Sequence, residues 1–181
     1  MRLLRRRRGG DADPVRGLVV RPARPGDGDA VVAMARALGR ADGVRASGFT
    51  AERFRSDGFG DDRAFDTLVA EAADGLLGYA IFYPGYDTDS ASRGLYLADL
   101  YVREGFRRRG VGRALVQGLA AHGQGRGARW MFWSVRRSNR RARRFYRALA
   151  PELPGILLCA AFGRRFELLA ERGAASVRRP D

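Results

Sequence analysis

The residues best suited to hold a charged ligand form the run from Arg107 to Gly112, which reads Arg-Arg-Arg-Gly-Val-Gly. Glycines let the backbone approach a ligand closely, and the N–H groups at the start of a helix have no intrahelical partner and point toward an anion. The three arginines add charge-assisted hydrogen bonds. A run of this kind between a strand and a helix predicts a cradle for phosphate groups.

Two common nucleotide motifs do not fit this run. A dinucleotide fingerprint needs a third glycine, where this chain has Leu115, and an acidic residue about 20 positions further on, whereas the next acid after Leu115 is Glu152. A P-loop needs a lysine, and the chain contains none. Taken alone, the run also fits a glycine turn beside a solvated basic face.

Apolar periodicity predicts the elements that position this run. Strands are predicted over 17–22, 66–71, 78–83, 95–102 and 130–135. Helices are predicted over 30–38, 51–54 with Thr50 as N-cap, 111–121 and 139–149, followed by a closing hairpin of 155–160 and 166–169. This order predicts an α/β (α+β) fold, in which a mixed, mostly antiparallel sheet carries helices on both faces.

Length and composition limit the number of domains and the classes of protein that this chain can belong to. The 181 residues suit one domain, predicted over 17–171 between a basic, disordered tail at 1–16 and a C-terminal tail at 172–181. No apolar run approaches the roughly 18 residues of a membrane-spanning helix, and no apolar segment follows the basic N-terminus, so a cytoplasmic protein is expected. Cys159 is the only cysteine, which excludes an internal disulfide and a Cys-rich zinc site.

Charge is unevenly distributed. The net charge is +14, every basic residue is arginine, and the segment from Arg103 to Arg147 contains 14 arginines and one acid, Glu104. Such a concentration fits a polyanionic partner, either nucleic acid or a phosphate-rich cofactor.

With these elements in order, the sequence resembles the Gcn5-related N-acetyltransferase (GNAT) superfamily over roughly residues 18–170. The family signature Arg/Gln-x-x-Gly-x-Gly/Ala is matched by Arg107, Gly110 and Gly112. A second signature, Asn-x-x-Ala-x-x-x-Tyr on a later helix, is matched by Asn139, Ala142 and Tyr146.

The resemblance implies acetyl-CoA as co-substrate and no metal. The implied contacts with the thioester and pantetheine are backbone groups of Leu100, Tyr101 and Val102, with Asn139 and Ala142 alongside. The implied pyrophosphate cradle includes the signature residue Arg107 and the amides of Arg108, Arg109, Gly110, Val111, Gly112 and Arg113. Tyr146 is the implied acid for the leaving thiolate, and a phenol with a pKa near 10 suits that role.

More narrowly, the segments 78–83, 86–87 and 95–102 look like those of the diamine (spermidine/spermine) acetyltransferase branch. That branch usually has Leu-Glu-Asp where this chain has Leu97, Ala98 and Asp99, so an active-site carboxylate of the branch is missing. Asp99 and Asp87 remain to bind the acceptor amine, each with an ordinary structural role as the alternative. The arginines before Asn139 would repel a polyamine, so a different amine is expected.

The function expected is acetyl transfer from acetyl-CoA to a primary amine of a small molecule by direct attack, with a homodimer as a possible assembly and no membrane partner. Three alternatives stay open. A protein or peptide amine could be the acceptor, the domain could bind coenzyme A without catalysis, or the arginine face could bind nucleic acid. The last ranks low because the sequence shows no helix-turn-helix and no aromatic ribonucleoprotein signature.

Overall fold

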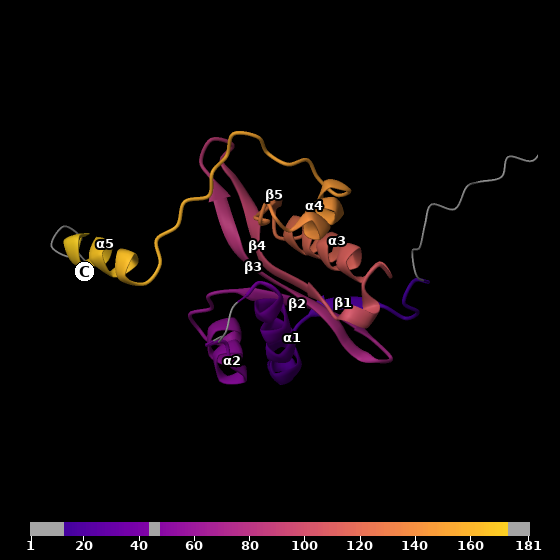
Figure 1. Ribbon diagram of the computed structural model, residues 1–181. Coiled ribbons are helices and arrows are strands. Elements are labelled where there is room, and N and C mark those ends of the chain that lie inside the picture. Colours follow the sequence, from indigo (N-terminus) through magenta and orange to yellow (C-terminus); the bar gives the residue numbers. More distant parts are fainter. Residues whose placement is uncertain (1–12, 44–47, 174–181) are drawn as a thin grey trace, which may run out of the picture. The chain divides into compact units, whose positions relative to one another are not determined.

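The computed structural model describes residues 13–43 and 48–173, and the chain divides into two compact units (Figure 1). The first unit extends to Trp133 and contains the sheet, and the second begins at Ser134 and contains two helices among its described residues. Most of the predicted tails, 1–16 and 172–181, lie outside the described residues, and the domain bounds 17–171 stay a prediction. No helix among the described residues is long and apolar enough to cross a membrane.

The first unit is built on a five-stranded sheet whose spatial order is the chain order. Its strands are β1 (Val19–Pro22), β2 (Asp66–Ala72), β3 (Gly75–Asp87), β4 (Ser92–Val102) and β5 (Ala128–Trp133). Neighbours pair antiparallel as far as β4, and β5 then joins β4 in parallel. This confirms the predicted mixed, mostly antiparallel sheet. The strands predicted over 78–83 and 95–102 are longer than expected, because β3 continues to Asp87 and β4 already begins at Ser92, which leaves only a tight turn between them.

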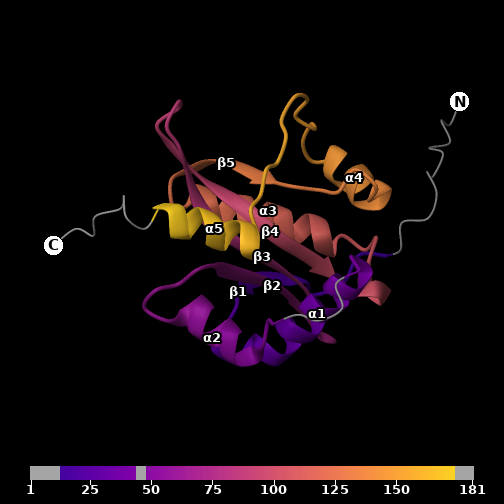
Figure 2. The ribbon, with the colours of Figure 1, turned by 60° about the vertical axis from the view of Figure 1, so that its left-hand side comes forward.

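Helices cover both faces of this sheet, as predicted. The short helices of this unit are η1 (Pro25–Asp27) and η2 (Glu104–Phe106), and the longer ones are α1 (Gly28–Ala41), α2 (Ala51–Phe59) and α3 (Val111–Gln124). Figures 1 and 2 show α1 and α2 on one face and α3 on the other. Thr50 caps α2 by accepting a hydrogen bond from the Arg53 amide at 3.1 Å, which confirms the predicted N-cap.

The core lies on both sides of β2 and β3. Val31, Phe54 and Tyr79 are fully buried in the cluster beneath α1 and α2, and Leu115 and Leu119 of α3 are fully buried as well. Because both faces of the central strands are covered, their sequences are nearly continuous apolar runs instead of alternating ones. The rigid sheet thus fixes the position of β4, from which the candidate site is built.

The second unit contains α4 (Arg140–Arg147) and α5 (Arg164–Gly173). The predicted closing hairpin was wrong: residues 155–160 form no strand, and 166–169 are helical. The reason is local, since the sequence Phe-Glu-Leu-Leu-Ala-Glu favours a helix. Arg164 also forms ion pairs with Glu167 at 3.7 Å and with Glu171 at 2.9 Å along the same helix.

Candidate active site

An irregularity in β4 creates an open strand edge. Asp99 pairs with Ile81 and Leu97 with Phe82, so Ala98 is an extra residue, a β-bulge. Beyond this bulge β4 pairs with β3 alone, because β5 pairs with β4 only as far as Leu97. Within the described part of the first unit, residues 98–102 therefore present one backbone edge with no neighbouring strand, and an extended amide-containing ligand can add to such an edge.

The turn after β4 is shaped to receive an anion. Arg108 and Gly110 have left-handed backbone angles, with φ values of 61° and 85°, and such turns direct successive N–H groups into a concavity that binds anions. The first intrahelical hydrogen bond of α3 is donated by the amide of Ala114 to Gly110 at 2.9 Å, so the amides of residues 111–113 precede it. A non-glycine residue held at positive φ is an uncommon conformation that often marks a binding site.

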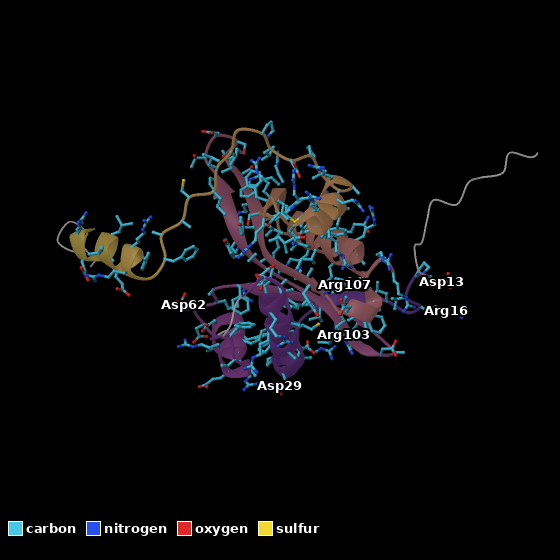
Figure 3. The ribbon with its side chains drawn as sticks, in the orientation of Figure 1. Asp13, Arg16, Asp29, Asp62, Arg103 and Arg107 are labelled. Carbon is cyan, nitrogen blue, oxygen red and sulfur yellow. The ribbon has the colours of Figure 1, made fainter. Side chains whose placement is uncertain are left out.

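Two of the predicted cofactor-binding arginines fix this turn with their side chains. Arg107 donates from Nε to the Val102 carbonyl at 3.0 Å, pairs with Glu104 at 3.2 Å, and places its guanidinium 5.6 Å from the Tyr101 ring centre. Figure 3 labels Arg103 and Arg107, which lie on either side of η2 just after β4 ends. The guanidinium of Arg107 thus ties the end of β4 to the anion turn, and the carbonyl of Val102 already has a partner.

Arg109 makes a similar structural contact, since its Nε donates to the Asp13 carbonyl at 2.9 Å and its guanidinium lies over Phe106. Arg108 and Arg113 are exposed instead. The arginines of this run therefore divide into two that hold the backbone of the turn and two whose charges face solvent beside it.

Asp99 is a half-buried carboxyl beside the bulge. The Tyr79 hydroxyl donates to its Oδ2 at 3.2 Å, and the Tyr79 ring stacks on Tyr101 at 6.3 Å between centres. Burial raises the pKa of Asp99, an effect that the hydrogen bond from Tyr79 offsets only in part. Burial and the nearby Asp99 carboxylate also raise the pKa of the Tyr79 phenol. A cationic group next to Asp99 would favour its ionised form.

Asp87, the other residue predicted to bind the acceptor, lies at the far end of the same hairpin. It pairs with Ser92 in the β3–β4 register, whereas Asp99 pairs with Ile81. Its carboxylate accepts from the amide of Asp89 at 3.3 Å and from the amide and hydroxyl of Ser90, which lowers its pKa. The structure therefore does not bring the two aspartates together, and Asp87 caps the hairpin turn.

The second signature of the sequence lies in the second unit. The Asn139 side chain caps α4, with Oδ1 accepting from the Ala142 amide at 3.0 Å. Tyr146 is half-buried on the same helix, and its ring lies 5.1 Å from that of Phe145. The three-residue spacing from Asn139 to Ala142 thus has a structural basis as a helix cap. This capping role of Asn139 was not predicted from the sequence.

Sequence analysis also missed Tyr79, the hydrogen-bond partner of Asp99. Tyr79 is diagonal to Asp99 across the strand pair, a geometry in which aromatic side chains reach their neighbours. The register that creates this diagonal depends on the bulge at Ala98, and no residue type in the sequence marks that bulge.

Comparison with known proteins identifies the family. The family model described as the acetyltransferase (GNAT) family matches residues 34–150. The chain belongs to the GNAT acetyltransferase family. It is 30% identical over 147 residues to the thialysine N-epsilon-acetyltransferase of Bos taurus, which covers 75% of this chain and 84% of that protein. It is also 30% identical over 92 residues to the L-ornithine N5-acetyltransferase NATA1 of Arabidopsis thaliana, over 51% of this chain and 37% of that one.

Solved structures support the same fold. The integron cassette protein VCH_CASS6 from the mobile metagenome of V. cholerae superposes with a TM-score of 0.72 at 19% identity, covering 85% of this chain and 98% of that one. As a GNAT acetyltransferase, this protein is an acetyl-CoA-dependent N-acetyltransferase that transfers an acetyl group to a primary amine. The predicted family and reaction are thereby confirmed.

Proposed function

We propose that this GNAT acetyltransferase acts on a primary amine of a small molecule and that Asp99 attracts the cationic form of that amine. The observation that carries the proposal is a half-buried carboxyl next to the bulge in β4, with a single phenol donor, Tyr79, among the described side chains that contact it. An ammonium group supplies the missing positive charge. The named acceptors of the two relatives, thialysine and L-ornithine, are small amines as well.

Acetyl-CoA fits the other end of β4. We infer that its amide groups hydrogen-bond along the open edge at Leu100, Tyr101 and Val102, and that its pyrophosphate lies on the amides of the turn at 108–113. The left-handed residues Arg108 and Gly110 support this assignment, since backbone of this kind directs successive N–H groups into one concavity. When bound, acetyl-CoA supplies an activated thioester, which needs no metal to react with an amine.

The reaction makes one bond and breaks another. The neutral amine nitrogen attacks the thioester carbonyl, the carbon–nitrogen bond forms, and the carbon–sulfur bond breaks. The amine proton passes to solvent, directly or by way of Asp99. We assign Tyr146 as the acid that donates its phenolic proton to the departing sulfur, a role worth about 10²–10⁴-fold in rate. Asn139 and Ala142 present the start of α4 to the pantetheine arm, as the family resemblance implies.

Asp87 has a smaller part in this proposal. Its carboxylate already accepts hydrogen bonds from Ser90 and Asp89, so less of its charge is available to an acceptor. We further propose a single acetyltransferase domain over 17–171, a cytoplasmic location where acetyl-CoA is available, a homodimeric assembly, and no membrane or nucleic-acid partner.

A panel of amines tests the substrate proposal. Thiol release from acetyl-CoA would be followed with small amines, polyamines and peptides with free amino groups, each matched in concentration. The proposal expects turnover with small primary amines and a raised KM in Asp99→Asn, with a smaller change in Asp87→Asn. Turnover restricted to peptides, or a KM that neither variant changes, would contradict it.

A further inference from the structure

The strand register of the first unit places aromatic side chains at neighbouring positions on β3, β4 and β5. Tyr83 pairs with Tyr96, and Tyr96 pairs with Phe132. Residues directly opposite each other in neighbouring strands point to the same face of a sheet. The Tyr83 and Tyr96 rings stack at 5.1 Å between centres, with 23° between their planes. The three rings therefore form a row across three strands.

A second row on the same face contains a single large side chain. Gly85 pairs with Gly94, and Gly94 pairs with Trp130. The Trp130 ring lies 4.9 Å from the Phe132 ring, so the two rows are in contact. We refer to the aromatic side chains of both rows, Tyr83, Tyr96, Trp130 and Phe132, as the aromatic platform.

Asp99 lies on this face as well, in the row next to Tyr83 and Tyr96. Its partner Ile81 is two residues from Tyr83 on β3, and residues two apart in a regular strand point to the same face. Asp99 and Tyr96 are three residues apart, so in a regular strand they would point to opposite faces. The extra residue of the bulge, Ala98, reverses this alternation. The platform therefore begins beside the carboxyl that attracts the amine in the proposed function.

The platform is open to solvent, whereas the other side of Asp99 is covered. Tyr83 is 40% exposed and Phe132 is 48% exposed. In the opposite direction along the face, Tyr79 is fully buried in the cluster beneath α1 and α2. An acceptor whose amine lies at Asp99 thus has room to extend over the platform.

The charges of this face select what the rest of the acceptor can be. In the three rows of described residues that contain Ile81, Tyr83 and Gly85, Asp99 is the single charged side chain. A carboxylate on the acceptor would find no cation in these rows. It would also approach Asp99 and Asp42, which lies near enough to raise the pKa of Asp99 further. An aromatic group, in contrast, gains from burial and from stacking on the exposed rings.

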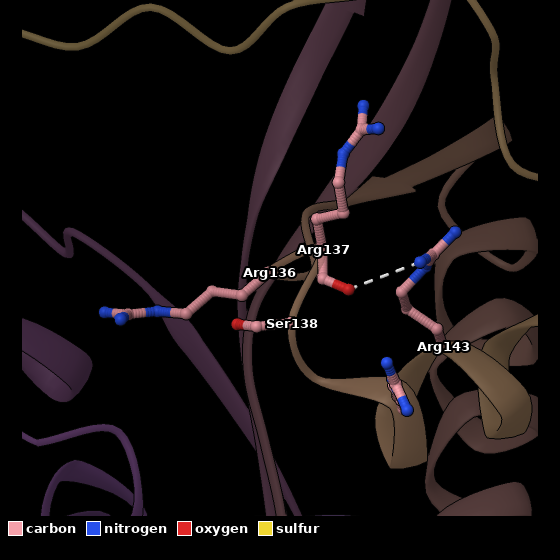
Figure 4. Close-up of a pocket in the computed structure, with 5 residues that line it drawn as sticks. Arg136, Arg137, Ser138 and Arg143 are labelled. Atoms are coloured by element: carbon pink, nitrogen blue, oxygen red, sulfur yellow. Dashed lines mark hydrogen bonds between the residues drawn. The ribbon is translucent and has the colours of Figure 1, made fainter.

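The arginine-lined hollow of the second unit offers no comparable surface. Its volume is about 830 Å³ and it is wide open to solvent (Figure 4). The lining residues are Arg136, Arg137, Ser138, Arg140 and Arg143. They include no aromatic or aliphatic side chain, and four guanidinium groups repel a cationic amine. The hollow therefore does not compete with the platform for an amine that carries an aromatic ring.

We propose that the acceptor is an arylalkylamine, with its amine at Asp99 and its aromatic ring stacked on the aromatic platform. This inference rests on the function proposed above, because Asp99 places the amine. Neighbouring rows on one face are about 7 Å apart along the strand, so an alkyl linker of two or three carbons between amine and ring is long enough. Tyr83 and Phe132, the exposed members of the platform, are then specificity-determining residues.

Matched amines and matched tyrosine variants test the proposal. Initial rates of thiol release from acetyl-CoA give kcat/KM for 2-phenylethylamine, 2-cyclohexylethylamine and ethylamine. The variant is Tyr83→Thr, because a β-branched residue suits a strand. The matched control is Tyr86→Thr on the same strand, where Tyr86 is 63% exposed and points to the opposite face.

We expect Tyr83→Thr to lower kcat/KM for 2-phenylethylamine by about tenfold, mainly through a raised KM, because one stacking partner is lost. The value for ethylamine should change little, and 2-cyclohexylethylamine should lose less than its aromatic counterpart. Tyr86→Thr should affect none of the three. Each variant is compared with the unaltered protein on the same amine, so differences in amine basicity cancel. An equal loss for all three amines, or no selective loss for 2-phenylethylamine, overturns the proposal.

Further measurements keep the platform testable on its own. If Tyr83→Thr does not fold by circular dichroism, Phe132→Leu replaces it, since Phe132 is exposed. If the unaltered protein acetylates ethylamine without any effect of the platform variants on 2-phenylethylamine, the proposed function stands and this inference fails. If it acetylates no amine, the proposed function fails, and equilibrium dialysis of 2-phenylethylamine against the three proteins decides the platform. Saturable binding that Tyr83→Thr weakens and Tyr86→Thr does not supports the site even then, and its absence overturns it.

A second copy of the chain is the competing occupant of the platform. Sedimentation velocity over a range of concentrations would detect it as a dimer that Tyr83→Thr dissociates and Tyr86→Thr does not. Such a dimer, together with equal effects of Tyr83→Thr on all three amines, would assign the platform to a subunit interface and overturn the proposal.

Discussion

Tyr146 and Asp99 are assigned to opposite ends of the proposed reaction, the departing sulfur and the incoming amine. Tyr146 is half-buried beside Phe145, and Asp99 accepts a hydrogen bond from Tyr79. Replacing tyrosine by phenylalanine removes the hydroxyl that can donate a proton and keeps the ring that packs. Substitutions that remove single atoms therefore separate the chemical roles of these residues from their packing.

Tyr146→Phe should lower kcat by about 10²-fold or more, because the leaving thiolate loses its general acid. The dissociation constant of acetyl-CoA should change little, since the aromatic ring remains. Calorimetry and initial-rate kinetics on the same preparation give both quantities. An unchanged kcat would mean that another group, or water, protonates the thiolate.

Asp99 should also make the stability of the protein depend on pH. Burial raises the pKa of this carboxyl above its unfolded value of about 3.9. Its contribution to stability is thus fully present below that unfolded pKa and is lost as the pH rises through the folded pKa. Asp99→Asn should remove this loss, so the variant gains stability relative to the parent between pH 4 and pH 7. Denaturant unfolding at both pH values measures the difference, and a constant offset would argue against the raised pKa.

The elements of the fold were predictable to the extent that their apolar patterns are local. The strands around 66–71 and 78–83, the helix over 111–121 and the cap at Thr50 follow from the spacing and type of neighbouring residues. The bulge at Ala98 does not, because it depends on the register between β3 and β4. The same bulge produces the open edge of β4 and brings Tyr79 to Asp99, so the geometry of the candidate site needed the structure.

The pairing register of β3, β4 and β5 also places Gly85 and Gly94 against the Trp130 ring. A Cβ atom at Gly94 would lie 2.0 Å from the Trp130 ring, and one at Gly85 would lie 2.6 Å from it. The Trp130 indole also donates to the Ser92 carbonyl at 3.3 Å. The indole therefore lies flat against the β3–β4 hairpin, and this contact joins β5 to the strands that carry the site.

Gly94→Ala should destabilise the protein by about 1–3 kcal/mol, because the added methyl overpacks the Trp130 ring. Gly26→Ala is the matched control, since a Cβ there meets nothing within 4 Å. The free energy of unfolding in urea measures both. In the double variant Gly94→Ala/Trp130→Ala the two effects should be less than additive, and strict additivity would show that the indole does not occupy this space.

The stability of helix α4 should depend on Glu152. Glu152 neutralises Arg143 and Arg147, and its lowered pKa means that this contribution is present above the unfolded pKa and is lost as the pH falls toward 2. Glu152→Gln should weaken the protection of α4 amides from hydrogen exchange at neutral pH. High salt should reduce the difference, because exposed ion pairs are screened. Equal protection in both proteins at low salt would contradict this assignment.

At the scale of the whole molecule, positive charge and cofactor chemistry coincide. The arginine-rich segment noted in the sequence contains the anion turn before α3 in the first unit and the arginines of α4 in the second. In the function proposed above, the pyrophosphate of acetyl-CoA uses the charge at the anion turn. The sequence alone could predict the charge and the family signatures. It could not show that part of the charge, at Arg107 and Arg109, holds the protein's own backbone.

The central step proposed for this protein is acetyl transfer from acetyl-CoA to a small primary amine. Mass spectrometry of the acceptor, with thiol release recorded in the same reaction, measures that step. We expect one N-acetylated amine formed for each thiol released, and negligible thiol release without an acceptor. Saturable binding of acetyl-CoA without any acetylated product, across small amines and peptides alike, would contradict it and leave a domain that binds the cofactor without using it.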